Sequence, residues 1–252
     1  MSEKYKPYRN KNIFDPTSEE EFKLSRTRID NFIECPKCFY MDRRLGVRRP
    51  PQIPFTLNQA VDTLLKKEFD VYRAEGTAHP LMKAYGLDAV PFQHEKMEEW
   101  RDAMRRGVTA KIDGTPILVT GGLDDVWQDA DGKLIIVDYK ATSKAGEVDL
   151  DAEWQDSYKR QMEMYQWLFR KNGFEVSYTG YFVYCNGVTD KQAFDGKLEF
   201  DIKLIPHVGN DSWVEPTIRE AIETLKSDTL PASSDNCEFC KYREAAAKVE
   251  QQ

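Results

Sequence analysis

The sequence lacks any long apolar run, and no stretch of it approaches the roughly 18 residues that a membrane-spanning helix needs. Its first residues, MSEKYKPYRNKN, contain no apolar region like that of a secretory signal peptide. We therefore expect no membrane segment and a cytoplasmic location. Cysteine is scarce, with 5 in 252 residues, and four of these form two C-x-x-C pairs. In a reducing compartment such pairs indicate a metal site rather than disulfides.

Excess positive charge is also missing. The formal net charge of −7 argues weakly against a nucleic-acid partner, because affinity for phosphate comes largely from Lys and Arg. Residues 1–49 are an exception, with twelve Lys and Arg against eight Asp and Glu. The arginines of this segment can form a solvated surface or a phosphate-binding patch, and the sequence leaves both open: Arg26, Arg28, Arg43, Arg44, Arg48 and Arg49.

The most informative stretch is 117–140, which contains two apolar-rich segments, 117–128 and 133–140, that predict two strands. A turn at Ala130-Asp131-Gly132 joins them, and Gly132 can supply the positive φ that a three-residue hairpin loop requires. We take Asp129 and Lys133 as the last paired residues. This register places Asp124 opposite Asp138.

Side chains alternate between the two faces of a strand, so Asp138 and Lys140 share a face and Tyr139 points to the other. Two carboxylates about 5 Å apart repel by roughly 3 kcal/mol at an effective dielectric near 20, and a divalent cation between them reverses the sign. Carboxylate oxygens suit Mg²⁺ or Mn²⁺, and a nearby lysine can orient water or neutralise a phosphate. The pattern favours phosphodiester cleavage. A hairpin with a solvated acidic edge is the alternative.

Further elements follow from periodicity and from turn residues. Helices are predicted at 25–35, 56–73, 95–106, 152–171 and 216–226, and strands at 108–112, 176–185 and 197–205. Residues 1–23 are polar and predict a loosely held arm, and 76–93 predict connecting structure. Cys185 has no cysteine near it in sequence and is predicted to be a buried small residue.

Two of these helices carry residues that matter for the site. Gln161 and Tyr165 lie four residues apart and share a face, which suits either packing or contact with a substrate. Apolar residues elsewhere on the same helix are expected to be buried: Trp154, Met162, Leu168 and Phe169. The helix at 56–73 has an apolar stripe predicted to face the core: Leu57, Val61, Leu64, Leu65 and Phe69.

Three motifs occur in a fixed order: Gly122-Leu123-Asp124, Asp138-Tyr139-Lys140 and Gln161-x-x-x-Tyr165. Together they resemble the motifs of the PD-(D/E)xK nuclease superfamily. The resemblance is strongest to the branch that includes RecB-type nuclease domains and the CRISPR-associated iron–sulfur exonucleases, and it covers roughly residues 24–245. It implies that the aspartates bind metal, that Lys140 assists catalysis, and that Gln161 and Tyr165 contact the substrate.

The same resemblance implies the fold. We expect a restriction-endonuclease-like αβββαβ core, in which a mixed sheet is flanked by helices, within a single domain at 24–252. Relatives often carry a metal-ligating histidine on the second helix, but here Asp62 stands at that place and none of the 3 histidines does. Asp62 is therefore a candidate third ligand for Mg²⁺ or Mn²⁺, and a surface carboxylate is the alternative.

The paired cysteines, Cys35 with Cys38 and Cys237 with Cys240, have a spacing that lets each pair hold one metal centre. They would then join the two ends of the nuclease core in a clasp. The resemblance implies a 4Fe-4S cluster, although those relatives commonly use one cysteine from the front and three from the back. Here Cys38 would replace the last of them. Zinc and unliganded cysteines stay open as alternatives.

These observations predict a divalent-metal-dependent nuclease. The resemblance alone implies that its substrate is DNA and that it is an exonuclease on single-stranded or frayed DNA. The resemblance also implies a helicase, CRISPR or recombination partner. Two rivals stay open. One is a catalytically inert nuclease-like module that binds DNA or a helicase-type partner, and Asp62 in place of histidine favours it. The other is a zinc-clasped structural or adaptor protein.

Overall fold

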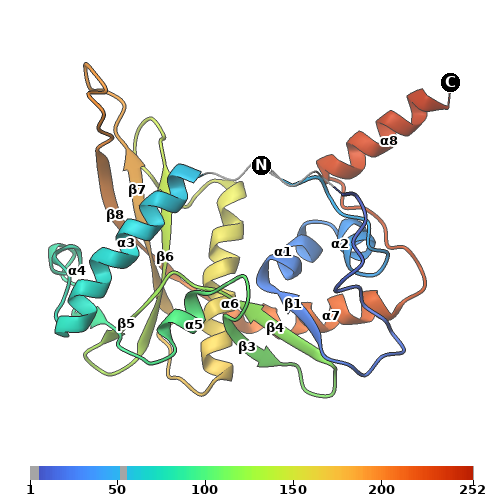
Figure 1. The fold of residues 1–252 in the computed structure, drawn as a ribbon, viewed down its shortest axis with the longest axis horizontal. Coiled ribbons are helices and arrows are strands. Elements are labelled where there is room, and N and C mark those ends of the chain that lie inside the picture. The colour runs from blue at the N-terminus through green and yellow to red at the C-terminus, as the bar shows by residue number, and fades with distance from the viewer. Residues whose placement is uncertain (1–5, 52–55, 252) are drawn as a thin grey trace. The chain divides into compact units, whose positions relative to one another are not determined.

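The computed structural model describes residues 6–51 and 56–251, which form two compact units (Figure 1). The first, here called the cysteine unit, contains residues 6–51, 111–119 and 212–251. The second, called the sheet unit, contains residues 56–110 and 120–211. Two of the four passages of the chain between the units fall within strands, β3 (Val108–Lys111) and β4 (Ile117–Gly121).

The sheet unit contains a mixed five-stranded sheet in the order β2-β5-β6-β7-β8. Its strands are β2 (Ala89–Pro91), β5 (Asp125–Asp129), β6 (Leu134–Thr142), β7 (Thr179–Gly187) and β8 (Phe200–Val208). The pair β6–β7 is parallel and the other three pairs are antiparallel. The predicted mixed sheet with flanking helices is confirmed.

Helices cover both faces of this sheet. They are α3 (Thr56–Glu75), α4 (Pro80–Ala84), α5 (Met97–Arg101) and α6 (Asp156–Lys171), the last preceded by a 3₁₀ turn at Glu153–Gln155. On one face Phe69 of α3 stacks on Trp127, with ring centroids 5.3 Å apart. On the other face Met162 of α6 lies so close to Gly180 that no side chain would fit there. Figure 1 shows α3 and α6 alongside the strands that they contact.

The cysteine unit is mainly helical. Its elements are β1 (Phe22–Ser25), α1 (Arg26–Glu34), α2 (Pro36–Arg43), α7 (Val214–Lys226) and α8 (Glu238–Glu250), and a 3₁₀ turn at Asp211–Trp213 precedes α7. The strand β1 belongs to a second sheet, in the order β1-β4-β3. The described part of the N-terminal arm is tied down: the amide of Arg9 donates to the carbonyl of Gly46 at 2.8 Å, and Phe14 is buried. It is therefore held more firmly than predicted.

The hairpin register is the one that the turn predicted. Asp125 pairs with Val137 and Gln128 with Leu134, so Asp124 and Asp138 come next in the same register. Gly132 has φ +84°, and the Asp129 amide donates to the Lys133 carbonyl at 3.0 Å. The segment predicted as one strand at 117–128 is interrupted, however. Its two parts, β4 and β5, lie in different sheets on either side of Gly122-Leu123-Asp124.

Three residues predicted to be buried are exposed. Leu57, Leu64 and Trp154 keep 59%, 63% and 59% of their surface, whereas Leu65 and Phe69 of the same stripe are buried as predicted. Periodicity places residues on one side of a helix, but it cannot show how far that side is covered by the sheet. The segment 76–93 contains α4 and β2, which the sequence analysis missed because both are very short. Cys185 is buried in the core, as predicted.

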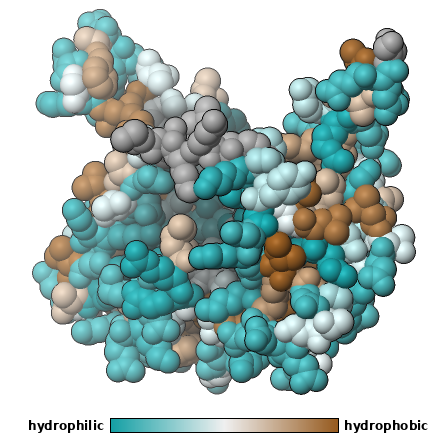
Figure 2. All heavy atoms as spheres, turned by 45° about the vertical axis from the view of Figure 1, so that its right-hand side comes forward, coloured by the Kyte–Doolittle hydropathy of each residue, from teal (hydrophilic) through white to brown (hydrophobic). Residues whose placement is uncertain are grey.

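Hydrophilic residues cover most of the face drawn in Figure 2, and hydrophobic residues gather there in small groups. Among the described residues, no helix combines the length and the apolar character needed to cross a membrane.

Candidate active site and cysteine cluster

Strand β6 and helix α6 bring three of the predicted site residues together. Asp138 is fully buried, and Lys140 lies on the same face with its Nζ against Asp138 Oδ2. Gln161 lies beside both: its Nε2 donates to Asp138 Oδ1 at 2.7 Å, and Lys140 Nζ donates to its Oε1 at 3.4 Å. Tyr139 points to the opposite face and packs in the core with Phe69.

Asp124 approaches this group from the adjoining end of β5. Its Oδ2 accepts the Tyr139 amide N–H at 2.9 Å, so the carboxylate is fixed to the strand that carries Asp138 and Lys140. Its other oxygen, Oδ1, accepts from Lys66 Nζ at 3.2 Å. Lys66 also binds Asp62 Oδ2 at 2.9 Å, one turn earlier on α3. A second lysine thus connects Asp62 to the site.

The charges of this cluster shift one another. Burial alone would raise the pKa of Asp124, but Lys66 and then Lys140 outweigh it and lower that pKa. Burial, followed by repulsion from Asp124, raises the pKa of Asp62. Burial opposes the charge on Lys140, yet Asp138 and Asp124 raise its pKa overall. The site therefore holds ionised Asp124 and an ammonium at Lys140 near neutral pH.

The Gly-Gly pair before Asp124 allows the close packing that shapes the site. A Cβ at Gly121 would lie 2.9 Å from the Tyr165 ring, and a Cβ at Gly122 would overlap Ala103. Tyr165 Oη donates to the Gly122 carbonyl at 2.6 Å and accepts from Gln161 Nε2 at 3.2 Å. In this structure Tyr165 is buried and fixes the turn that leads to Asp124.

A buried ion-pair network behind the site was not found from the sequence. Asp125 is fully buried and contacts Arg73 and Arg101, the latter at 3.2 Å. It also accepts from Trp127 Nε1 at 3.1 Å and from Tyr139 Oη at 2.8 Å. Burial, and then the negative Asp125, raise the pKa of Tyr139 well above its ordinary value. The phenol stays protonated and can donate.

Arg101 connects this network to the candidate metal ligands. Its Nε donates to the backbone carbonyl of Asp124 at 3.1 Å, and its Nη atoms bind Asp70 at 2.8 and 3.0 Å. The two arginine partners of Asp125 lie 24 and 52 residues away in sequence, so no local pattern indicates them. The contact between Lys66 and Asp62 could have been predicted from the sequence, because the two residues are four apart and such pairs meet on a helix.

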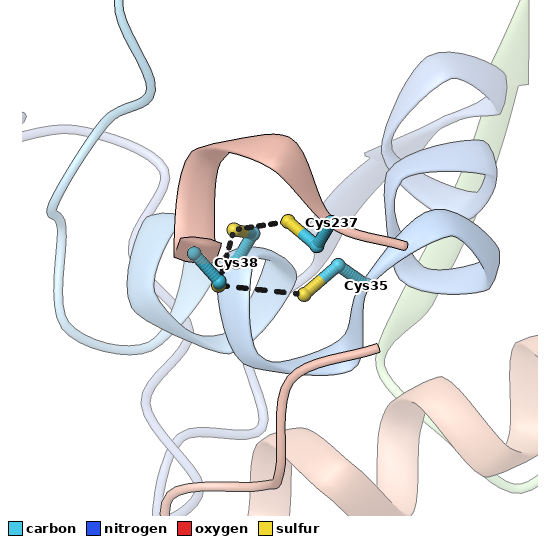
Figure 3. A group of neighbouring side chains, drawn as sticks. Cys35, Cys38 and Cys237 are labelled. Atoms are coloured by element: carbon cyan, nitrogen blue, oxygen red, sulfur yellow. Dashed lines mark hydrogen bonds between the residues drawn. The ribbon is translucent and has the colours of Figure 1, made fainter. Parts of the chain in front are cut away.

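The four paired cysteines lie together in the cysteine unit. All are buried, and their Sγ atoms all lie within 4.8 Å of one another. Cys38 Sγ is 3.5 Å from Cys240 Sγ and 3.6 Å from Cys237 Sγ, and the Cys35–Cys240 separation is 3.9 Å. Figure 3 shows the thiols of Cys35, Cys38 and Cys237 directed toward a common point.

Arg49 lies against this cluster. Its Nη2 is 3.8 Å from Cys237 Sγ, and its guanidinium carbon is 4.7 Å from the centre of the Phe239 ring. Glu34 binds its Nη1 at 3.0 Å. A fixed cation beside sulfur ligands favours their thiolate form, which is the form that binds metal.

The two clusters suit different metals. The carboxylates of Asp62, Asp124 and Asp138 are hard oxygen donors, which are suited to Mg²⁺ or Mn²⁺. The four thiols are soft donors, which are suited to zinc or to an iron–sulfur cluster. By donor type, the carboxylates thus fit the predicted Mg²⁺ or Mn²⁺, and the thiols fit either the 4Fe-4S cluster or the alternative zinc ion.

Comparison with known proteins gives a family. A family model of the PD-(D/E)XK nuclease superfamily matches residues 23–245. No curated protein matches the chain. Among solved structures, the chain is similar to the one titled "Crystal structure of SSO0001", with 14% sequence identity and a TM-score of 0.39, over 82% of this chain and 78% of that one.

Proposed function

Because the chain belongs to the PD-(D/E)XK nuclease superfamily, we propose that it is a divalent-metal-dependent nuclease that hydrolyses phosphodiester bonds. One observation carries the proposal. Asp124, Asp138 and Lys140 meet beside β6, the central strand of the five-stranded sheet, and Gln161 hydrogen-bonds to both Asp138 and Lys140. Two carboxylates with an adjacent ammonium can hold a metal ion and neutralise a phosphate.

Each residue has a distinct role in this proposal. Asp124 and Asp138 would hold Mg²⁺ or Mn²⁺, with Asp62 as a third candidate ligand, and the bound ion would act as a Lewis acid toward the phosphate and lower the pKa of water. Lys140 remains an ammonium, since Asp138 and Asp124 raise its pKa against the effect of burial. It can donate a hydrogen bond to the phosphate or hold the attacking water.

In this proposal Gln161 and Tyr165 hold the other site residues in position. Gln161 keeps Asp138 and Lys140 in fixed positions through its two hydrogen bonds, 2.7 and 3.4 Å long. Tyr165 holds the Gly122 carbonyl and thereby the turn before Asp124. Near a substrate, the amide of Gln161 could also orient the strand, as the resemblance implies.

The finer specificity is also a proposal. The resemblance to the RecB-type and CRISPR-associated branch supports DNA as the polymer, single-stranded or frayed ends as the substrate, and exonucleolytic cleavage. The same resemblance supports a helicase-type partner.

For the cysteine cluster we propose one zinc ion rather than the 4Fe-4S cluster. A tetrahedral ion with Zn–S bonds of about 2.3 Å places its sulfurs roughly 3.8 Å apart. Three of the separations, 3.5, 3.6 and 3.9 Å, lie near this spacing, and all of the Sγ atoms lie within 4.8 Å of one another. A cubane binds each thiolate through a different iron and so spreads the sulfurs farther. Metal analysis and the visible spectrum after anaerobic purification would distinguish the two.

A second candidate function is an inert nucleic-acid-binding module. Lys66 favours it, because this ammonium already neutralises Asp62 and Asp124 without a metal ion. The inert module predicts no stabilisation by Mn²⁺. The nuclease predicts a rise in melting temperature with Mn²⁺ that Asp124→Ala abolishes.

Cleavage of end-labelled single-stranded and duplex DNA and RNA, with Mg²⁺ or Mn²⁺, tests the main proposal. Lys140→Ala should reduce the rate by at least about 10²-fold, as expected for the loss of a charge-stabilising donor. Lys144→Ala is the matched control, because its side chain is 47% exposed and forms an ion pair with Asp149 at the surface. A ladder from one end would identify an exonuclease.

Circular dichroism must show that Lys140→Ala is folded. If the parent protein cleaves none of these substrates with its cysteine metal intact, the nuclease proposal fails. It also fails if folded Lys140→Ala cleaves as fast as the parent.

A further inference from the structure

A groove opens beside the candidate active site. It encloses about 510 Å³ and lies between the start of α3, the end of β6 and the start of α6. Its apolar wall includes Leu57, Val61, Trp154, Tyr158 and Phe200. Leu57 and Trp154 were both predicted to be buried, and each keeps 59% of its surface exposed. These two departures from the sequence pattern thus fall in the same place.

The groove adjoins the catalytic lysine. Tyr158 lies in its wall, and Lys140 Nζ is 4.5 Å from the centre of the Tyr158 ring. Ala141, the residue after Lys140, also lines the groove, and its carbonyl accepts from Asn58 Nδ2 at 2.9 Å. A phosphate held by Lys140 would therefore have its neighbouring sugar and base at the mouth of the groove.

The lining is aromatic and uncharged. Among the described residues that line the groove, none is acidic or basic, and Trp154 and Tyr158 meet edge to face with ring centroids 5.4 Å apart. Exposed aromatic faces stack on nucleobases without strong sequence preference. Asn58, Thr142 and Ser143 add polar groups that suit the edges of a base.

We propose that this groove binds an unpaired nucleobase of the strand whose phosphate lies at Lys140, with Trp154 as the main stacking residue. The inference rests on the proposed nuclease function and adds to it a base-binding subsite. A base inside a duplex is paired and stacked on its neighbours, so the groove would admit only single strands or frayed ends. The exposed Trp154 would thereby contribute to the selection of unpaired strands over duplex.

The continuity with Lys140 favours a nucleobase over an apolar peptide or a second copy of the chain. An apolar peptide would not contact the adjacent ammonium and carboxylates, whereas a nucleotide places its base in the groove and its phosphate at Lys140. The same chemistry would accept DNA or RNA, since the stacking faces are common to both.

Binding of labelled oligonucleotides to the 252-residue chain tests the proposal. Three 12-nucleotide probes are compared by fluorescence anisotropy, with Ca²⁺ as the added ion and a gel to verify intact strands: oligo-dT, oligo-U and an abasic strand of the same length. The abasic strand keeps every phosphate and lacks only the bases. It therefore separates stacking from phosphate binding.

Trp154→Ala should weaken oligo-dT binding about tenfold, the scale of one base–aromatic stack, and change abasic binding by less than about twofold. Trp154→Phe should restore most of the affinity. Tyr85→Ala, at a tyrosine that is 50% exposed and outside the groove, is the control and should have no effect. The same pattern with oligo-U would support the subsite for RNA as well.

Several results would overturn the inference alone. If the parent binds and cleaves, but Trp154→Ala weakens both strands equally or neither, no base occupies the groove. A change in oligomeric state with unchanged oligo-dT binding would instead show a contact between copies. If the parent neither binds nor cleaves any nucleic acid, the proposed function fails together with the subsite.

Discussion

The two candidate metal sites of this protein differ in how the chain balances their charge. In the sheet unit, the carboxylates of Asp62, Asp124 and Asp138 are matched by the ammonium groups of Lys66 and Lys140. In the cysteine unit, four buried thiols converge at one point, and Arg49 lies beside them. The lysines can therefore hold the carboxylates together by themselves, whereas the four thiols would gain most of their cohesion from a bound metal.

This difference has a consequence for stability and activity. Metal at the sulfur cluster should matter mainly for folding, because it joins segments from both ends of the chain. Metal at the oxygen cluster should matter mainly for chemistry, because lysines already hold the carboxylates in place. Three substitutions test this contrast.

The largest effect is expected for Cys240→Ser. Structural zinc contributes on the order of 10 kcal/mol in small peptides, so loss of one ligand should remove most of that stabilisation. We expect loss of the bound metal by elemental analysis and a large fall in melting temperature. Cys185→Ala is the control, because this buried thiol lies outside the cluster and its loss should leave the metal content unchanged. Full metal content in Cys240→Ser would contradict the clasp.

A smaller effect on stability is expected for Asp125→Asn. This change leaves Arg73 and Arg101 without their buried carboxylate and should cost about 3–5 kcal/mol in the free energy of unfolding, measured with urea. Asp131→Asn, at an exposed position in the same hairpin, should change the free energy by less than about 0.5 kcal/mol. An equal, small effect of both substitutions would show that the network does not support the site.

The smallest effect is expected for Lys66→Met, which removes the cation that competes with metal for Asp62 and Asp124. At an effective dielectric near 20, one charge at about 4 Å is worth a few kcal/mol, and solvent at this partly exposed group reduces it. We expect Mn²⁺ to bind roughly tenfold more tightly by titration calorimetry. Lys67→Met, at the exposed neighbouring lysine, is the control. Weaker Mn²⁺ binding in Lys66→Met would show that Lys66 supports the ion instead.

Much of the site geometry could be predicted because it depends on local rules. The turn at Gly132 determines the hairpin register, and the register determines which residues lie opposite each other. Strand alternation separates Tyr139 from Asp138 and Lys140. Helical spacing brings Gln161 next to Tyr165. Each C-x-x-C pair is a local unit that can be recognised in the sequence, and the structure brings the two pairs together.

The rest depends on contacts that local rules do not contain. Asp125, Arg73 and Arg101 form their network across three separate elements, and each residue alone is an ordinary charged residue in the sequence. The exposure of Leu57 and Trp154 depends on where the sheet ends, not on their spacing along a helix. At the break between β4 and β5, Gly122 packs against Ala103 so closely that a Cβ would overlap it, and no local pattern indicates this contact.

The separation of the two cysteine pairs in sequence also determines how long the first pair waits for the second during synthesis. Cys38 and Cys240 are 202 residues apart, and a ribosome adds about 5–20 residues per second. The first C-x-x-C pair would therefore emerge roughly 10–40 seconds before the second pair exists. During this interval Cys35 and Cys38 lack the second pair of ligands, so their thiols can react with oxidants or bind a metal elsewhere. The sheet unit, whose last residue precedes Cys237, can be complete before the cluster closes.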